Sequence, residues 1–204
     1  MAKASTAWDF LNCAVIVAHP DDETLWAGGT ILTHTQSRWT ILSLSRKSDA
    51  DRSEKFNKVM KKYRAKGFMA DLDDEPEQQS VDPKLIKDTI LELLPPIQYD
   101  LVMTHSIWGE YNRHKRHEEI AKAVRELWEA KDINARNLWM FAYEQKENQL
   151  PKAIYNADQI INLPSYIWDQ KYEIITRDYG FKEDSFEAKT TPKREAFWKF
   201  AAAR

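Results

Sequence analysis

The feature that most constrains the fold is a run of six apolar residues, CAVIVA, at positions 13–18. A short apolar run rich in valine and isoleucine is typical of a strand buried on both faces of a parallel sheet. The run ends at His19-Pro20, and acidic residues follow at once. Carboxylates are stabilised at the positive end of a helix dipole, so this order indicates a strand, a tight turn and then a helix.

The rest of the chain repeats this alternation. We expect strands at residues 39–45, 67–70, 99–104, 138–143 and 159–163, and helices at residues 51–66, 82–94, 114–129 and 166–176. Alternating strands and helices form βαβ units. The pattern therefore predicts one α/β domain over residues 1–204, with a mostly parallel sheet and helices on both faces. From Asp178 onward the chain is aromatic and charged without a clear period, which suits either a core-covering flap or a subunit contact.

Composition excludes several classes of protein. With 30 basic and 32 acidic residues, the net charge of −2 gives no electrostatic reason to expect nucleic acid or an anionic membrane as a partner. No apolar stretch approaches the roughly 20 residues of a membrane span, and the N-terminus lacks the pattern of a signal peptide. The single cysteine, Cys13, excludes an internal disulfide and fits a reducing cytoplasm.

The turn after the first strand carries the first chemical signal. His19, Asp21 and Asp22 crowd several titratable groups onto one turn, where a divalent cation is a natural compensation. Imidazole and carboxylate suit zinc. The competing interpretation is that one aspartate caps the helix and the histidine is incidental.

The second signal is a cluster of histidines. Three of the five histidines, His105, His114 and His117, fall within thirteen positions, and the last two share one face of the predicted helix. Taken alone, such a pair is often a surface feature. Because ligands bind beyond the carboxyl ends of parallel strands, we expect both segments at one crevice. Two ligands from the first segment and one from the second leave a coordination position open, which is typical of catalytic zinc.

The run AHPDDE at residues 18–23, with GEY and HxxH at residues 109–117, resembles the LmbE-like deacetylases, the PIG-L family of zinc-dependent N-deacetylases. The likeness extends from the first strand to about Tyr143. It implies a Rossmann-like α/β fold and removal of an acetyl group from an N-acetylglucosamine-type amino sugar or conjugate. It also implies Zn²⁺ ligands at His19, Asp22 and His117.

The same resemblance implies catalytic roles. Asp21 corresponds to the general base and His114 to the histidine that stabilises the oxyanion. The family usually has Pro-Asp between the two histidines, where this chain has Lys115-Arg116. Without that carboxylate, and with two cations adjacent, we expect the imidazolium of His114 to be less favoured.

Four further residues are candidates for substrate binding. Arg46 and Arg52 could hold a hydroxyl-rich or anionic group, although surface salt bridges are an alternative. Glu110 could instead orient a ligating histidine or be solvated, and Tyr111 could wall the pocket or simply pack. We expect the acidic run at residues 71–79 to be a solvated loop.

The sequence leaves open the identity of the metal, whether the protein is catalytic, and its oligomeric state. Iron(II) also accepts two histidines and a carboxylate, although its oxygenases use another fold. A non-catalytic protein that binds metal and sugar could keep the same fold. A homo-oligomer is possible.

Overall fold

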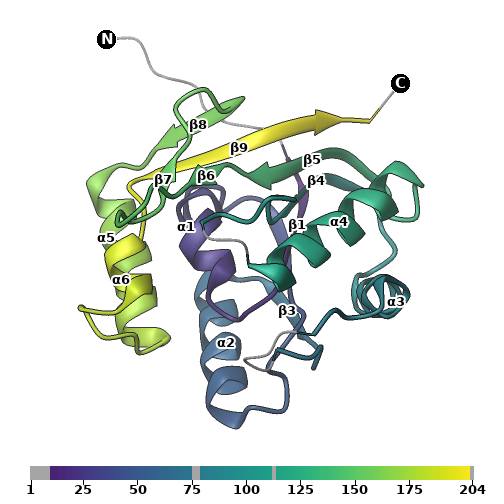
Figure 1. The fold of residues 1–204 in the computed structure, drawn as a ribbon, viewed down its shortest axis with the longest axis horizontal. Coiled ribbons are helices and arrows are strands. Elements are labelled where there is room, and N and C mark those ends of the chain that lie inside the picture. The colour runs from purple at the N-terminus through teal and green to yellow at the C-terminus, as the bar shows by residue number, and fades with distance from the viewer. Residues whose placement is uncertain (1–9, 75–78, 112–113, 203–204) are drawn as a thin grey trace.

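The structure is a computed structural model, and it describes residues 10–74, 79–111 and 114–202. A seven-stranded sheet runs in the order β3-β2-β1-β4-β5-β9-β8 (Figure 1). Its first five strands in this order are parallel, and β9 is antiparallel to both β5 and β8. This confirms the predicted α/β fold with a mostly parallel sheet.

The elements have the following bounds. The strands are β1 (Asn12–Val17), β2 (Arg38–Ser43), β3 (Lys66–Met69), β4 (Tyr99–Thr104), β5 (Ala135–Phe141), β6 (Tyr143–Glu144), β7 (Lys152–Ala153), β8 (Gln159–Asn162) and β9 (Arg194–Ala201). The helices are α1 (Asp22–Thr33), α2 (Ala50–Tyr63), α3 (Pro83–Leu93), α4 (Lys115–Glu129), α5 (Ser165–Glu173) and α6 (Phe186–Thr190). A π-helical turn, Ile174–Asp178, continues α5.

Strand β1 shows how the sheet separates two cores. Its side chains alternate between the faces, as the pleat requires. Cys13, Val15 and Val17 pack with the apolar sides of α1 and α2, whereas Ala14 and Ile16 pack with α3 and α4. The helices therefore cover both faces, with α3 and α4 on the side opposite α1 and α2 (Figure 1). This is why the whole of β1 is apolar.

The C-terminal segment contains a strand that the sequence did not predict. Strand β9 inserts between β5 and β8. Phe197 packs into one core, while Trp198 and Phe200 pack against the other. Because Arg194, Glu195 and Lys199 interrupt the apolar residues on both faces of β9, its residues show no simple alternation. Its aromatic side chains pack against the two cores, as the flap interpretation expected.

The C-terminal segment is also bonded to α1. Glu195 of β9 is fully buried and accepts hydrogen bonds from the backbone N–H groups of Gly29 and Thr30, each at 2.7 Å. Lys171 of α5 contacts the same carboxylate at 2.7 Å. A buried carboxylate needs such partners. Contacts from the C-terminal elements β9 and α5 therefore help to fix the position of α1, an N-terminal helix.

Among the described residues, no helix combines the length and the apolar character needed to cross a membrane.

Candidate active site

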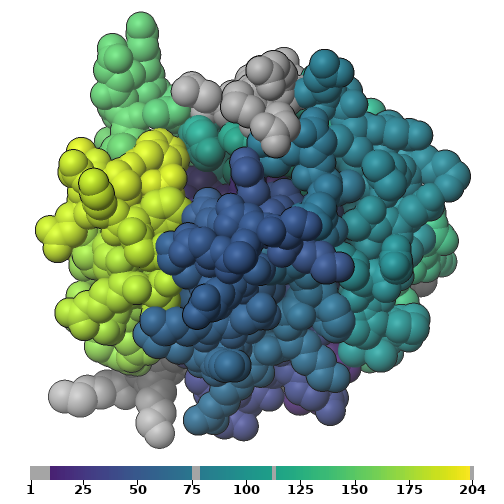
Figure 2. Space-filling model, turned by 90° about the horizontal axis from the view of Figure 1, so that it is seen from below, coloured from purple at the N-terminus to yellow at the C-terminus, as the bar shows by residue number. Residues whose placement is uncertain are grey.

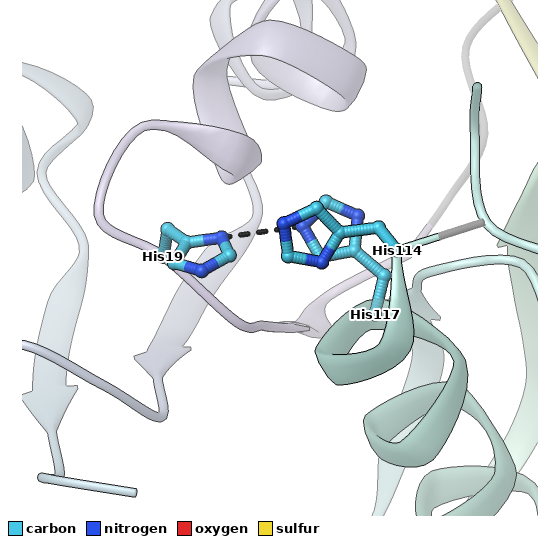
Figure 3. A group of neighbouring side chains, drawn as sticks. All are labelled: His19, His114 and His117. Atoms are coloured by element: carbon cyan, nitrogen blue, oxygen red, sulfur yellow. Dashed lines mark hydrogen bonds between the residues drawn. The ribbon is translucent and has the colours of Figure 1, made fainter. Parts of the chain in front are cut away.

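The topology brings together the turn after β1 and the start of α4, which carry the two motifs. Strands β1 and β4 are parallel neighbours, so their carboxyl ends lie at one edge of the sheet. His19 follows β1, while His114 and His117 lie at the start of α4, beyond β4. Figure 3 shows the three imidazoles gathered between these elements.

The expected metal ligands converge on one point. His19 Nδ1 lies 3.0 Å from Asp22 Oδ2 and 3.2 Å from His117 Nε2. His117 Nε2 lies 3.3 Å from the same Asp22 oxygen. A tetrahedral zinc ion with bonds of about 2.1 Å holds its ligands about 3.4 Å from one another. The donor set therefore fits zinc in both chemical type and spacing.

Each of these two histidines has a carboxylate behind it. His19 Nε2 lies 2.8 Å from Asp74 Oδ1, and His117 Nδ1 lies 2.6 Å from Glu110 Oε2. A carboxylate on one ring nitrogen directs the lone pair of the other nitrogen toward a metal. In both rings the free nitrogen is the one that faces Asp22. The orientation of both imidazoles is therefore that of metal ligands.

The electrostatics of this cluster favour positive charge. Burial opposes charge on His19, but hydrogen bonds with Asp22 and Asp74 outweigh it and raise its pKa to about 9. Burial also opposes charge on His117, and there Asp22 and Glu110 raise the pKa to about 10. For Asp22, burial is outweighed by the neighbouring histidines, which hold its pKa well below the usual range. The same negative field attracts a cation.

Asp21 does not cap the helix. It occupies the N-cap position of α1, yet its side chain makes no capping hydrogen bond. Its Oδ1 is buried, accepts no hydrogen bond from the described residues, and lies 3.8 Å from Arg52 Nη2. Burial, and then repulsion from Asp22, raise the pKa of Asp21 well above its usual value. A buried carboxylate with one oxygen that accepts no hydrogen bond from the described residues, beside a donor set for metal, is suited to accepting a proton.

His114 differs from the two neighbouring imidazoles. Its ring stacks on His117 with centroids 4.0 Å apart, but its Nδ1 is buried and has no hydrogen-bond partner among the described residues. Burial, and then repulsion from His117 and His19, lower its pKa to about 3. One of its nitrogens lies within 4.8 Å of donor atoms of those two histidines, so His114 is also within reach of a metal.

The cations next to His114 do not cause this low pKa. Arg116 is fully buried and turns away, contacting Glu119 and donating to the backbone carbonyl of Gln79 at 3.1 Å. The pKa of His114 is lowered, which is the direction expected from the sequence. Its largest causes are burial and the neighbouring histidines, whereas the expectation rested on the missing carboxylate and on the adjacent Lys115 and Arg116.

His105 has a structural hydrogen bond. Its Nε2 accepts the backbone N–H of Ala18 at 2.9 Å, which leaves that lone pair occupied. Its Nδ1 lies 3.2 Å from Glu110 Oε2. Burial, and then the nearby His117, lower the pKa of His105, which favours the neutral ring that this acceptor role requires.

The four candidates for substrate binding lie around this cluster. Arg46 binds Asp74 Oδ2 at 2.8 Å, and Arg52 lies over the ring of Phe181 at 5.3 Å. Glu110 is fully buried behind His117. Tyr111 stacks on Trp26, contacts Phe186, and lies with its ring 6.1 Å from that of His114. Their roles toward a substrate stay predictions.

Asp74 is the site residue that sequence reasoning missed. The acidic run was expected to be solvated, whereas the Asp74 side chain is only 9% exposed and bonds His19 and Arg46. Residues 75–78 of that run lie outside the described residues. A signal was present in the sequence, because the run follows β3, and β3 ends at the same edge of the sheet as β1 and β4.

Comparison with solved structures shows shared folds at low identity. N,N'-diacetylchitobiose deacetylase from Pyrococcus horikoshii is 14% identical with a TM-score of 0.71, covering 95% of this chain and 85% of that one. Teicoplanin deacetylase, in a zinc-inhibited form, is 13% identical with a TM-score of 0.66, covering 94% and 98%. The 4-carboxy-2-hydroxymuconate hydratase of Pseudomonas putida is 17% identical with a TM-score of 0.65, covering 95% and 98%.

Comparison of sequences identifies the family. An uncharacterized protein of Acanthamoeba polyphaga mimivirus is 23% identical over 185 residues, which are 83% of this chain and 76% of the viral protein. The model of the PIG-L family, described as GlcNAc-PI de-N-acetylase, matches residues 14–128. That match spans more than half of the chain and contains the strand, the turn and the HxxH helix start described above. The chain belongs to the PIG-L family.

Proposed function

We propose that this protein is a zinc-dependent N-deacetylase that acts on an N-acetylated amino sugar or its conjugate. The observation that carries the proposal is the convergence of His19, Asp22 and His117, whose donor atoms lie 3.0–3.3 Å apart, next to Asp21, whose buried Oδ1 accepts no hydrogen bond from the described residues. Three protein ligands leave room for a further group, as catalysis requires.

Zinc bound by these three residues would supply a Lewis acid that polarises an amide carbonyl and makes water a stronger acid. Asp74 and Glu110 would keep the two imidazoles in the orientation that binds the metal. The presence of both carboxylates is consistent with a site that binds metal.

Asp21 is the proposed general base. Its raised pKa makes it a better proton acceptor than an ordinary aspartate, and it lies beside the ligand Asp22. A group that has accepted a proton from water is also suited to pass it to the departing amine. Arg52, 3.8 Å away, would moderate the charge of this carboxylate.

His114 is proposed to stabilise the oxyanion, with one change from the sequence analysis. With a pKa lowered to about 3 it is neutral near pH 7, so its ring N–H would donate as a neutral imidazole. Neutral imidazoles can donate one hydrogen bond. The ring needs no carboxylate behind it for this role, which fits the unpartnered Nδ1.

The substrate class is proposed from relatives. The family model is described as GlcNAc-PI de-N-acetylase, and one solved neighbour is a diacetylchitobiose deacetylase. The half-buried ring of Tyr111, which lies beside His114 and stacks on the buried Trp26, would suit the apolar face of a sugar. Arg46 and Arg52 would then bind hydroxyl or anionic groups.

The proposal is tested by measuring acetate release from a panel of N-acetylglucosamine conjugates with zinc-loaded protein. We expect release from at least one conjugate, and loss of about 100- to 10,000-fold in kcat for Asp21→Asn while zinc is retained. Lys84→Ala, at an exposed site on α3 where the lysine pairs with Asp88, is the control. Undiminished turnover in Asp21→Asn would refute the role of Asp21.

A non-catalytic protein that binds metal and sugar is the second candidate. It is favoured by Lys115-Arg116, which stand where the family usually has Pro-Asp. The fold alone does not decide, because a hydratase shares it. Binding of an acetylated sugar to zinc-loaded protein, without acetate release from any conjugate, would favour this candidate.

A further inference from the structure

The third acid of the turn, Glu23, is fully buried and has no part in the metal cluster. Its Oε2 accepts the backbone N–H of Asp21 at 3.0 Å. Its Oε1 accepts the hydroxyls of Thr24 and Tyr179, each at 2.6 Å. One carboxylate therefore links the backbone of the proposed base to a tyrosine far along the chain.

The backbone of Asp21 needs such support. Its φ of 137° and ψ of −29° lie in a region that residues other than glycine rarely adopt. A conformation of this kind persists only when its surroundings hold it. The carbonyl of Asp21 is fixed because it accepts the N–H groups of Thr24 and Leu25 in the first turn of α1, at 2.9 and 2.8 Å. The N–H of Asp21 is fixed by Glu23.

Tyr179 reaches Glu23 from the segment that follows α5. This segment packs alongside α2 in the space-filling view (Figure 2), and Asp178 is paired there with Lys58, at 3.0 Å, and with Lys62. The ring of Tyr179 is buried. Its hydroxyl therefore comes from a packed part of the fold that lies beyond the residues matched by the family model.

We propose that Glu23 and Tyr179 are positioning residues, which hold Asp21 in its left-handed conformation so that its carboxylate stays beside the metal ligands. The inference rests on the proposed function in that Asp21 is the base. The proposal adds to the site the segment after α5, which has no other role there.

The test compares four variants in zinc-loaded protein. Glu23→Met keeps the length of the side chain but removes the acceptor, and Glu23→Gln keeps an oxygen for the Asp21 N–H. Tyr179→Phe removes only a hydroxyl. Tyr143→Phe is the matched control, because its buried hydroxyl donates to the carbonyls of Trp26 and Arg194 and not to Glu23.

We expect kcat to fall by about 100-fold in Glu23→Met, since small misplacements of catalytic groups have effects of this size. KM and zinc content should be unchanged, because the metal ligands are untouched. Glu23→Gln should recover most of the activity. Tyr179→Phe should lose about fivefold, the effect of one ordinary hydrogen bond, while Tyr143→Phe should leave kcat unchanged.

Hydrogen exchange of the Asp21 amide gives a readout that does not depend on activity. It should be faster in Tyr179→Phe and Glu23→Met than in the wild type or in Tyr143→Phe. Unchanged exchange in the first two variants would overturn the inference, as would equal losses of kcat in Tyr179→Phe and Tyr143→Phe. If no conjugate is hydrolysed even by the wild type, the proposed function fails, and the exchange rates still decide the positioning role. Tyr179→Phe keeps the test available if Glu23→Met does not fold.

Discussion

His117 and His114 lie three residues apart at the start of one helix, with their rings stacked, yet their surroundings differ completely. His117 has Glu110 behind it and Asp22 in front, and its pKa rises to about 10. His114 has no hydrogen-bond partner for its Nδ1 among the described residues, and its pKa falls to about 3. The comparison teaches that neighbouring carboxylates, and not the place in a motif, set the charge of each imidazole, which suits His117 to the proposed role of metal ligand and His114 to the proposed role of neutral donor.

The largest expected effect comes from removing each ring in turn. Zinc sites of this kind bind with about 10–16 kcal/mol shared among few ligands, so His117→Ala should lower zinc affinity by roughly 1,000-fold or more. His114→Ala should keep stoichiometric zinc and lose about 100-fold in kcat, as for loss of an oxyanion donor. Elemental analysis of both proteins, purified without added metal, checks this and also identifies zinc or iron. Loss of metal in His114→Ala would show that this ring is a ligand.

The next largest effect is expected from the carboxylates that contact the proposed ligands His117 and His19. Glu110→Gln and Asp74→Asn should each lower zinc affinity by about 10- to 100-fold, the usual effect of losing such a partner. The larger loss should come from Glu110→Gln, because Glu110 is fully buried and also lies 3.2 Å from His105 Nδ1. Competition titration with a chelating dye measures both affinities. An affinity equal to the wild type in both variants would contradict the orienting role.

Zinc should also stabilise the folded protein. At a free zinc concentration about 100 times Kd, the midpoint of thermal unfolding should rise by about 5–10 °C. His114→Ala should show the same rise, whereas His117→Ala should show none. Differential scanning calorimetry with and without a chelator makes the comparison. An equal rise in both variants would mean that zinc binds elsewhere.

The smallest effect is expected at Lys115. The low pKa of His114 comes from burial, His117 and His19, and Lys115 is not among its causes. Lys115→Ala should therefore change kcat by less than about twofold, as is usual for substitutions away from buried networks. Steady-state kinetics on the best substrate measures it. A gain of tenfold would show that the cation next to His114 restrains catalysis.

Much of the fold could be predicted from local patterns. Strand β4 has the predicted bounds, and β1, β2 and β3 differ from prediction by one or two residues. Strands β1, β2 and β4 lie between parallel neighbours and are largely apolar runs between turns, whereas β3 is a short edge strand. Strand β9 could not be predicted, because Arg194, Glu195 and Lys199 interrupt its apolar residues and its neighbours, β5 and β8, are distant in sequence.

Part of the site could likewise be predicted from local patterns, and part could not. A histidine and aspartates directly after a strand, and two histidines on one helix face, are local signals, and they indicated the metal ligands. Tyr179 carries no such signal, since it reaches the site from a separate segment, and the signal for Asp74 was only its place in an acidic run after β3. The pKa of His114 likewise depends on how deeply the fold buries it and on which rings it faces.

The sequence by itself determined the alternation of strands and helices and the chemistry of the two motifs, because periodicity and residue type act over short distances along the chain. The tertiary structure alone decided which carboxylates stand behind His19 and His117, that none of the described residues does so for His114, and that Glu23 and Tyr179 hold the backbone of Asp21. These features require contacts between distant segments, and hydrogen bonds and charge interactions depend on distances that only the packed fold fixes.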